Sequence, residues 1–532
     1  MKYLYTDQLR HLVPLFLMFY FSSLPLYSQD ISWQKSIGGK QGEYLFDALP
    51  TPDYGSILAG SSVSVKSGDL QHTTQGSLDY FLWKLNEQGH QEWQKSLGGN
   101  QADYLYSIGL TQDGGYILGG SSFSGISGDK TDSCRGLNDY WIVKLDARGE
   151  IQWQKTLGGA GSDQLLSIRQ TSDLGYILGG SSDSPASSEK KEPSRGSMDF
   201  WIIKLDSKGT ILWQKTLGGE NYELLKSIRE IPGGYIAAGY SNSPAGFDKS
   251  ENSYGENDYW LVRLDNQGTV VWEKSYGGKG NDELADMIVT RDGGFLLAGS
   301  SDSPPEGTKS ASLGEGSDIW LIKTDPSGNP VWQQSVDMGA VDIPSKIMET
   351  EPGDFLIAGS SLSVDANGIM QSDYMTVKIS ASGEILWKKK IGGDRTDLLS
   401  CAAETRNGSL LLAGTSNSSL SRDKTVDTQG QTDFWVVKML TDEKQTTETQ
   451  RKSWEIYPNP TERFVNVIIA GELKGHENIQ VFDLSGKLLQ QKSVRYSTTP
   501  IDLSGYTPGV YLFSITLPSG IRESVKIIKS GN

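Results

Sequence analysis

The stretch that decides the fold is residues 139–159, DYWIVKLDARGEIQWQKTLGG, because versions of it recur down most of the 532-residue chain. Its tryptophan belongs to a series spaced 55 to 60 residues apart: Trp33, Trp93, Trp153, Trp213, Trp272, Trp332 and Trp387. An aspartate that mostly precedes aromatic residues recurs with it, at Asp79, Asp139, Asp199, Asp258, Asp318, Asp373 and Asp433. Such a fixed period predicts seven copies of one supersecondary unit.

Each copy predicts four short antiparallel strands. In the second copy, apolar runs at 104–108, 116–120, 140–145 and 151–157 are separated by Asp-Gly-Gly, by a long polar loop and by a turn ending in glycine. Glycine supplies the positive φ angles that tight hairpins need.

The predicted strands must be covered on both faces. Residues 140–143 (YWIV) are apolar at consecutive positions, whereas a sheet with one wet face would alternate apolar and polar residues. Sheets stacked radially around an axis cover each other in this way. The sequence therefore predicts an all-β protein with a seven-bladed β-propeller over residues 29–440.

The phase of the repeat predicts how the ring closes. The chain enters at a tryptophan-bearing strand, 32–36, and the last copy ends at 434–438 without a strand of that kind. The N-terminal strand is expected to complete the last blade, 397–439, which removes an open sheet edge. Four strands in plain chain order are the alternative, but they would leave only a four-residue turn to connect one blade to the next.

The N-terminus has the pattern of a secretory signal peptide. Lys2, Arg10 and His11 precede an apolar run at 12–21 that is too short to span a bilayer. We expect a signal peptide at 1–28 and no transmembrane segment elsewhere.

Charge and cysteine content exclude some classes of protein. The net charge of −16, without a basic stripe, argues against a nucleic-acid partner. The two cysteines, Cys134 and Cys401, are too few for a disulfide framework and are expected to be free thiols.

The repeats stop before a second domain. Residues 441–453 are almost entirely polar and predict a flexible linker. Residues 454–532 then show alternating strands that predict a small Ig-like β-sandwich.

Ordered motifs in this second domain carry a family resemblance. They are Tyr457-Pro458-Asn459-Pro460, the VFDLSGK run that contains Gly486 and Lys487, IDLS at 501–504, Gly509-Val510-Tyr511, and a closing KIIK run from Lys526 to Lys529. They resemble the type A C-terminal sorting domain of the type IX secretion system of Bacteroidota. The repeats are similar, more loosely, to glycine-rich propeller repeats that precede such domains. The resemblance implies a secreted or cell-surface protein whose partners include the type IX machinery and its processing sortase.

A carboxylate stands ten residues after each repeat tryptophan: Glu43, Asp103, Asp163, Glu223, Asp282, Asp342 and Asp397. In a propeller these side chains are expected to ring one face near the axis. They could form a polar ligand mouth or a cation site, with calcium as the possible metal and no other cofactor expected. Alternatively, each carboxylate accepts backbone N–H groups and holds its own turn.

Two further recurring features have structural explanations as well. The aspartates of the Asp79 series are expected to cap a loop where a strand begins. Most of these aspartates are followed by tryptophans, which are Trp83, Trp141, Trp201, Trp260, Trp320 and Trp435. Their rings could stack on sugars, but we expect them to pack between blades.

Long loops join the second and third strand of every copy, so all of them should emerge on one face, the face of the carboxylates. They span 61–78, 121–138, 181–198, 241–257, 301–317, 361–372 and 416–432. Their sequences vary while the strands do not, and they contain a few apolar residues such as Phe123, Phe247 and Tyr254. Recognition of a partner is expected there.

These features favour a noncatalytic module that binds an extracellular glycan, protein or envelope component. Only His72 and His90 lie in the repeats, so no Ser-His-Asp or zinc constellation is present and no catalytic residue is assigned. Two alternatives stay open: a polysaccharide hydrolase or lyase that uses carboxylates of separate blades, and a calcium-stabilised structural module.

Overall fold

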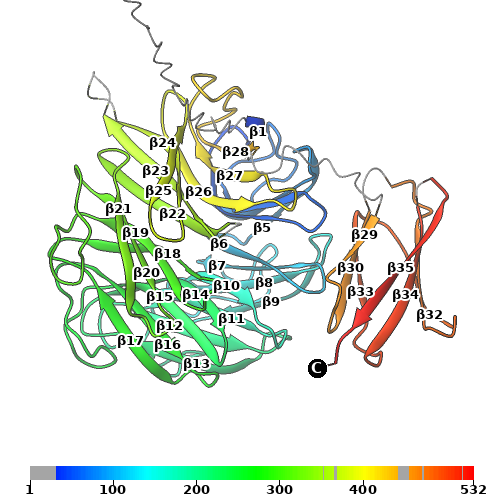
Figure 1. The fold of residues 1–532 in the computed structure, drawn as a ribbon, viewed down its shortest axis with the longest axis horizontal. Coiled ribbons are helices and arrows are strands. Elements are labelled where there is room, and N and C mark those ends of the chain that lie inside the picture. The colour runs from blue at the N-terminus through cyan, green and yellow to red at the C-terminus, as the bar shows by residue number, and fades with distance from the viewer. Residues whose placement is uncertain are drawn as a thin grey trace, which may run out of the picture.

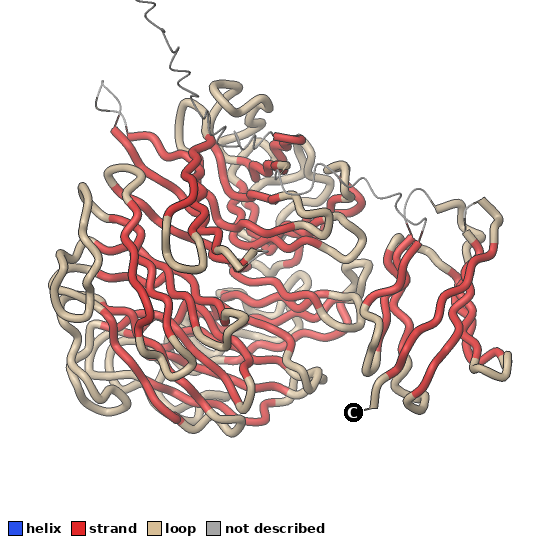
Figure 2. The backbone as a smooth tube through the Cα atoms, in the orientation of Figure 1, coloured by secondary structure: helices blue, strands red, loops and turns tan. Residues whose placement is uncertain are grey.

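The computed structural model describes residues 31–350, 353–364, 368, 370–440, 454–469, 473–517 and 519–531. All the secondary structure in these ranges is β, as predicted (Figure 2). The predicted signal peptide and the predicted linker lie outside the described residues.

Seven four-stranded antiparallel sheets form the repeat region. Six of them contain four strands that are consecutive in the chain. Their strands are β2 (Glu43–Pro50), β3 (Ser56–Ser62), β4 (Asp79–Leu85), β5 (Gln91–Leu97); β6 (Asp103–Leu110), β7 (Tyr116–Ser122), β8 (Asp139–Leu145), β9 (Ile151–Leu157); β10 (Asp163–Gln170), β11 (Tyr176–Ser182), β12 (Asp199–Leu205), β13 (Ile211–Leu217); β14 (Glu223–Ile231), β15 (Gly234–Ser241), β16 (Asp258–Leu264), β17 (Val270–Tyr276); β18 (Asp282–Val289), β19 (Phe295–Ser301), β20 (Asp318–Thr324), β21 (Pro330–Val336); and β22 (Val341–Glu349), β23 (Phe355–Val364), β24 (Met370–Ile379), β25 (Ile385–Ile391).

The seventh sheet joins the two ends of the repeat region. It contains β1 (Ile31–Ile37), β26 (Asp397–Glu404), β27 (Leu410–Ser416) and β28 (Asp433–Met439) in the order β1-β28-β27-β26. β1 pairs antiparallel with β28, with Lys35 opposite Val436, and Figure 1 shows the two strands side by side. The innermost strands also contact one another around the ring, β2 touching both β6 and β26. The seven-bladed propeller and its closure by the N-terminal strand are confirmed.

The core lies between the blades. Every residue of the third strand of a blade such as β8 is buried, because both faces of the strand are covered by neighbouring sheets. Tyr80 of the first blade packs on Trp141 of the second with ring centroids 4.5 Å apart, and its hydroxyl donates to the Trp141 carbonyl at 2.9 Å. The strand tryptophans therefore pack between blades.

The outer-strand tryptophans hold the turns of the following blade. Gly149 has φ of +80°, and a Cβ there would lie 3.1 Å from the ring of Trp93. Glycine is required at this position by both the backbone conformation and the close approach of the ring.

The sixth blade departs from the expected pattern. β23 and β24 are 10 residues each, and Val364 is paired with Met370. The loop expected at 361–372 is therefore wrong in its extent, since the two strands continue into it as a hairpin. This segment is the shortest of the seven, so it leaves little chain for a separate loop between the two paired strands.

The second domain is a sandwich of a three-stranded and a four-stranded sheet, as predicted. The sheets have the orders β29-β30-β33 and β32-β31-β34-β35. Their strands are β29 (Trp454–Tyr457), β30 (Phe464–Ile469), β31 (Asn478–Phe482), β32 (Leu488–Ser493), β33 (Thr498–Asp502), β34 (Gly509–Thr516) and β35 (Arg522–Lys529). Val465, Val481 and Phe513 are among the fully buried residues between the sheets.

Candidate functional site

The structure places the predicted carboxylate ring inside the protein. Each side chain begins an innermost strand, or lies next to its start, and all are 0% exposed: Glu43, Asp103, Asp163, Glu223, Asp282, Asp342 and Asp397. Asp103 is representative, since its Oδ2 accepts the Gly99 N–H at 2.7 Å and the Ser124 hydroxyl at 3.0 Å. This geometry fits the turn-holding alternative. The ligand-binding interpretation stays a prediction that requires the loops to open.

Each ring carboxylate lies close to an aspartate of the Asp79 series from the preceding blade. A Cβ on Gly38 would lie 2.2 Å from Asp433 Oδ1 and 2.7 Å from Glu43 Oε2, which explains a glycine between the two acids. Burial, aided by the neighbouring carboxylate, raises the pKa of Asp79, Asp139 and Asp199 to about 6 and that of Asp258 to about 7. These carboxyl groups therefore take up protons at a higher pH than a solvent-exposed aspartate does.

Buried lysines anchor five of the long loops, and sequence reasoning missed them. Lys130 is 1% exposed, lies 5.7 Å from the centre of the Trp141 ring, and donates to the Asp132 carbonyl at 2.7 Å. The same contact with a strand tryptophan is made by Lys190, Lys249, Lys309 and Lys424. A lysine nine residues before the repeat aspartate is the sequence signal that could have revealed them.

Exposed apolar side chains lie on the long-loop face, the surface formed by the seven long-loop segments. The buried lysines fix the bases of their loops, yet Ile126 is 70% exposed, Phe247 is 68% exposed and Leu420 is 66% exposed. Further large apolar side chains exposed on these segments are Val65, Phe123, Leu137, Tyr254, Val364 and Met370.

One acidic group could hold a metal ion. Asp318, Asp337 and Asp342 each place a carboxylate oxygen within 4.8 Å of the others, among the residues that the structure describes. Asp337 stands where the other repeats have the first glycine of the Gly-Gly pair. Oδ1 of Asp318 and Oδ1 of Asp342 are buried without a hydrogen-bond partner.

A cavity of about 200 Å³ lies between the innermost strands of all seven blades. Its lining breaks the sevenfold pattern, because charged side chains occur in only some blades: Asp47, Arg169, Lys226, Arg229, Asp286 and Lys346. The Cys401 thiol lies on the same strand as the lining residue Ser400, and burial raises its pKa to about 12, so it is no nucleophile. Cys134 and Cys401 are both free, as expected.

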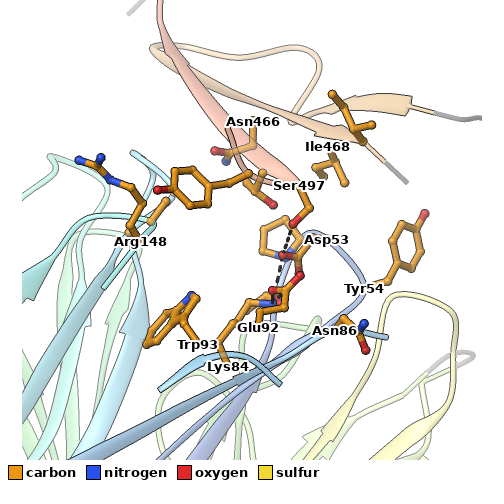
Figure 3. Close-up of a pocket in the computed structure, with 18 of the residues that line it drawn as sticks. Asp53, Tyr54, Lys84, Asn86, Glu92, Trp93, Arg148, Asn466, Ile468 and Ser497 are labelled. Atoms are coloured by element: carbon orange, nitrogen blue, oxygen red, sulfur yellow. Dashed lines mark hydrogen bonds and ion pairs between the residues drawn. The ribbon is translucent and has the colours of Figure 1, made fainter. Parts of the chain in front are cut away.

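A larger cleft of about 1190 Å³ separates the first two blades from the second domain (Figure 3). It lies at the short turns, such as 51–55, at the opposite end of the strands from the long-loop face. Ser497 donates to Asp53 at 3.2 Å, and Asp53 in turn pairs with Lys84 at 3.1 Å. The cleft therefore exists only while the second domain is attached.

Arg406 also connects the two domains. It pairs with Glu455 at 2.6 Å, and its guanidinium lies 4.7 Å from the centre of the Tyr54 ring and 5.3 Å from that of the Tyr457 ring. Tyr457 is one of the residues that carry the sorting-domain resemblance.

Within the described ranges, no helix has the length and hydropathy that a bilayer crossing requires.

Comparison with solved structures finds distant likenesses. The chain is 13% identical to an apocarotenoid oxygenase mutant of Synechocystis, with 77% of this chain and 94% of that chain covered and a TM-score of 0.35. The cobalt-substituted form of that oxygenase gives 13% identity, 76% and 93% coverage and a TM-score of 0.33. A puromycin hydrolase mutant gives 10% identity, 71% and 59% coverage and a TM-score of 0.33. None of these similarities carries an argument about activity.

The search of curated proteins found no match. The second domain does match a family: residues 455–530 fit the model of the secretion system C-terminal sorting domain. This match covers the motifs from Tyr457 to Lys529, so the predicted family, the export route and the predicted location are all supported. Residues 455–530 are a type IX secretion C-terminal sorting domain, and the protein that carries it is secreted or attached to the cell surface.

Proposed function

We propose that the exported propeller is a noncatalytic binding module that holds an extracellular glycan, protein or envelope component on its long-loop face. The observation that carries this proposal is the set of exposed apolar side chains on loops whose bases are fixed by buried lysines. Exposed apolar groups gathered on one face are typical of interaction sites.

The anchoring of the loops supports binding further. Lys190 is 1% exposed and donates to the Glu192 carbonyl at 2.8 Å and to Thr216 Oγ1 at 3.0 Å, so the loop path is fixed before any partner arrives. A preorganised surface loses less conformational entropy on binding than a mobile one.

The hydrolase or lyase alternative has less support. Acid–base chemistry on a sugar needs two carboxylates that flank the bond and reach it. Asp103 and Asp163 are fully buried and hold turns, so the loops would have to open before either could meet a substrate.

A binding screen tests the proposal. Folded full-length protein is applied to glycan arrays and to envelope fractions, and the double variant Phe247→Ser, Leu420→Ser is compared with Val271→Ser, which changes an exposed residue of an outer strand. We expect the double variant to lose at least about tenfold in affinity and the control to bind like the wild type. The absence of any partner, or an equal loss in the control, would overturn the proposal.

The acidic group at Asp318, Asp337 and Asp342 favours calcium stabilisation as a second candidate function. We expect calcium to raise the melting temperature of the wild type and EDTA to reverse the effect, because a divalent ion would relieve the repulsion among the three carboxylates. Asp337→Gly restores the glycine of the other repeats and should abolish the effect of calcium on the melting temperature. A melting temperature that does not change between calcium and EDTA excludes this function.

A further inference from the structure

The axial cavity is produced by a β-bulge in every innermost strand. In β14 the pairing with β15 shifts between Leu225 and Ser227, so Lys226 is an extra residue without a partner in the ladder. The equivalent extra residues are Phe46, Tyr106, Leu166, Ala285, Ser345 and Ser400, and all line the same cavity. A bulge turns such side chains out of the regular alternation, in this case toward the axis.

Cations outnumber carboxylates in this cavity. Its lining contains Arg169, Lys226, Arg229 and Lys346 but only Asp47 and Asp286. The imbalance occurs in a chain whose net charge is −16. It is therefore a local departure from the charge of the whole protein.

The two aspartates are already engaged. Asp47 has Oδ1 3.6 Å from Lys346 Nζ and Oδ2 4.0 Å from Arg169 Nη2, and Oδ2 also accepts the Ile108 N–H at 3.1 Å. Asp286 has Oδ1 3.4 Å from Arg229 Nη2. Both carboxylates are thus shared between cations and backbone groups.

Lys226 makes no ion pair with any carboxylate among the described residues. Among the described residues its ammonium group has no ion-pair or hydrogen-bond partner, and it lies 5.7 Å from the centre of the Tyr240 ring. Glu283 is the carboxylate that acts on it electrostatically, but this acid accepts from the Asn257 and Asn281 amides. Burial lowers the pKa of Lys226.

Arg229 supplies the matching donor. Its Nη1 donates to the Ile228 carbonyl at 2.9 Å and its Nη2 lies 3.4 Å from Asp286 Oδ1, while the side chain is 21% exposed and lines the cavity. Burial, with help from Arg169, lowers its pKa to about 10. A guanidinium group presents forked donors that suit a multi-oxygen anion, and a small anion would offset the cost of confining these cations.

We propose that the axial cavity binds a tetrahedral oxyanion of the phosphate or sulfate class, held by Lys226 and Arg229. The anion is either a free ion or the charged end group of a saccharide. The site does not depend on the long-loop face, because its ligands come from the innermost strands.

Calorimetric titration of the full chain at low ionic strength tests this site. The probes are inorganic phosphate, inorganic sulfate, a sulfated monosaccharide and its neutral parent sugar. Lys226→Leu and Arg229→Met replace the cations by the residues at equivalent positions of sister blades, Leu166 and Met348, so folding should survive. Lys208→Ala removes a charge from an exposed turn and is the control.

We expect saturable binding of one anion per chain, a loss of at least about tenfold in affinity for each cavity variant, and no change for Lys208→Ala. Tighter binding of the sulfated sugar than of sulfate identifies the saccharide as the source, and the reverse order identifies the free ion. Absence of saturable binding overturns the proposal. So does binding that both folded cavity variants retain, which would indicate an adventitious ion only. Neither failure affects the proposed role of the long-loop face.

Discussion

At the scale of single residues, two buried carboxylates from neighbouring blades lie close together at the blade junctions. Asp258 accepts the Tyr254 N–H, and the charge of Asp282 in the next blade raises its pKa further. The period of the sequence was enough to predict both series of acids. It could not predict that they meet, because the partners come from different blades and their closeness depends on the stacking angle.

The pH dependence of stability should report this pairing. The pKa of Asp258 is raised from 3.8 to about 7, so the folded state binds the proton more tightly than the unfolded state. The stabilisation is therefore fully present below about pH 4 and is lost as the pH rises toward 7. Asp258→Asn cannot ionise, so its melting temperature should fall less between pH 5 and pH 8 than that of the wild type.

Glu256→Gln is the matched control for this experiment, since it changes an exposed acid of the same loop. Its melting temperature should fall between pH 5 and pH 8 as much as that of the wild type. If the melting temperature of Asp258→Asn falls as steeply with pH as that of the wild type, Asp258 does not hold a proton in this range.

A second residue-scale prediction concerns the tryptophans. Trp201 is 0% exposed and its ring centre lies 4.7 Å from that of Tyr140 in the preceding blade. Trp201→Ala should lower the free energy of unfolding by about 3–5 kcal/mol in urea titrations. Trp213 is half-buried on an outer strand, so Trp213→Ala should lower the free energy of unfolding by less than half as much. Equal losses would contradict the assignment of Trp201 to the core.

At the scale of elements, the number of strands, their order and the closing strand could be predicted because each depends on the repeat phase. The bulges could not, since the extra residues have nothing in common: Phe46, Lys226 and Ala285 occupy equivalent positions. The hairpin of the sixth blade was missed because loop length alone does not show whether strands continue into it. Loop anchoring by Lys130 depends on a tryptophan that only the fold brings near.

Ring closure can be tested by a disulfide between its first and last strands. Lys35 and Val436 are directly opposite in the β1–β28 pair, so Lys35→Cys with Val436→Cys should form an intramolecular bond. The native cysteines are replaced by serine, which their sister repeats carry in Ser194 and Ser227. Non-reducing electrophoresis and mass analysis measure the product.

Leu411 lies one strand further from β1, opposite Lys438, so Lys35→Cys with Leu411→Cys should not form this bond. Intermolecular products only, or equal yields for both pairs, would argue against closure within one chain.

At the scale of the whole molecule, the sorting domain lies at the short turns and leaves the long-loop face free. Sequence motifs predicted the domain and the export route, but not this arrangement, because the contacts are made by turn residues such as Asp53 and Ser497 that carry no recurring signal. Removal of residues 441–532 should leave the affinity for a ligand of the long-loop face unchanged. Calorimetric titration before and after truncation measures it, and a loss of affinity would place the ligand in the cleft between the domains.

The central claim is that the long-loop face binds the ligand, and hydrogen exchange tests this claim most directly. Once the binding screen has identified a ligand, the full chain is compared with and without it by mass spectrometry. We predict protection in the long loops, above all at 121–138, 241–257 and 416–432, with the short turns unchanged. Protection confined to turns such as 51–55, or to residues 454–531, would contradict the account.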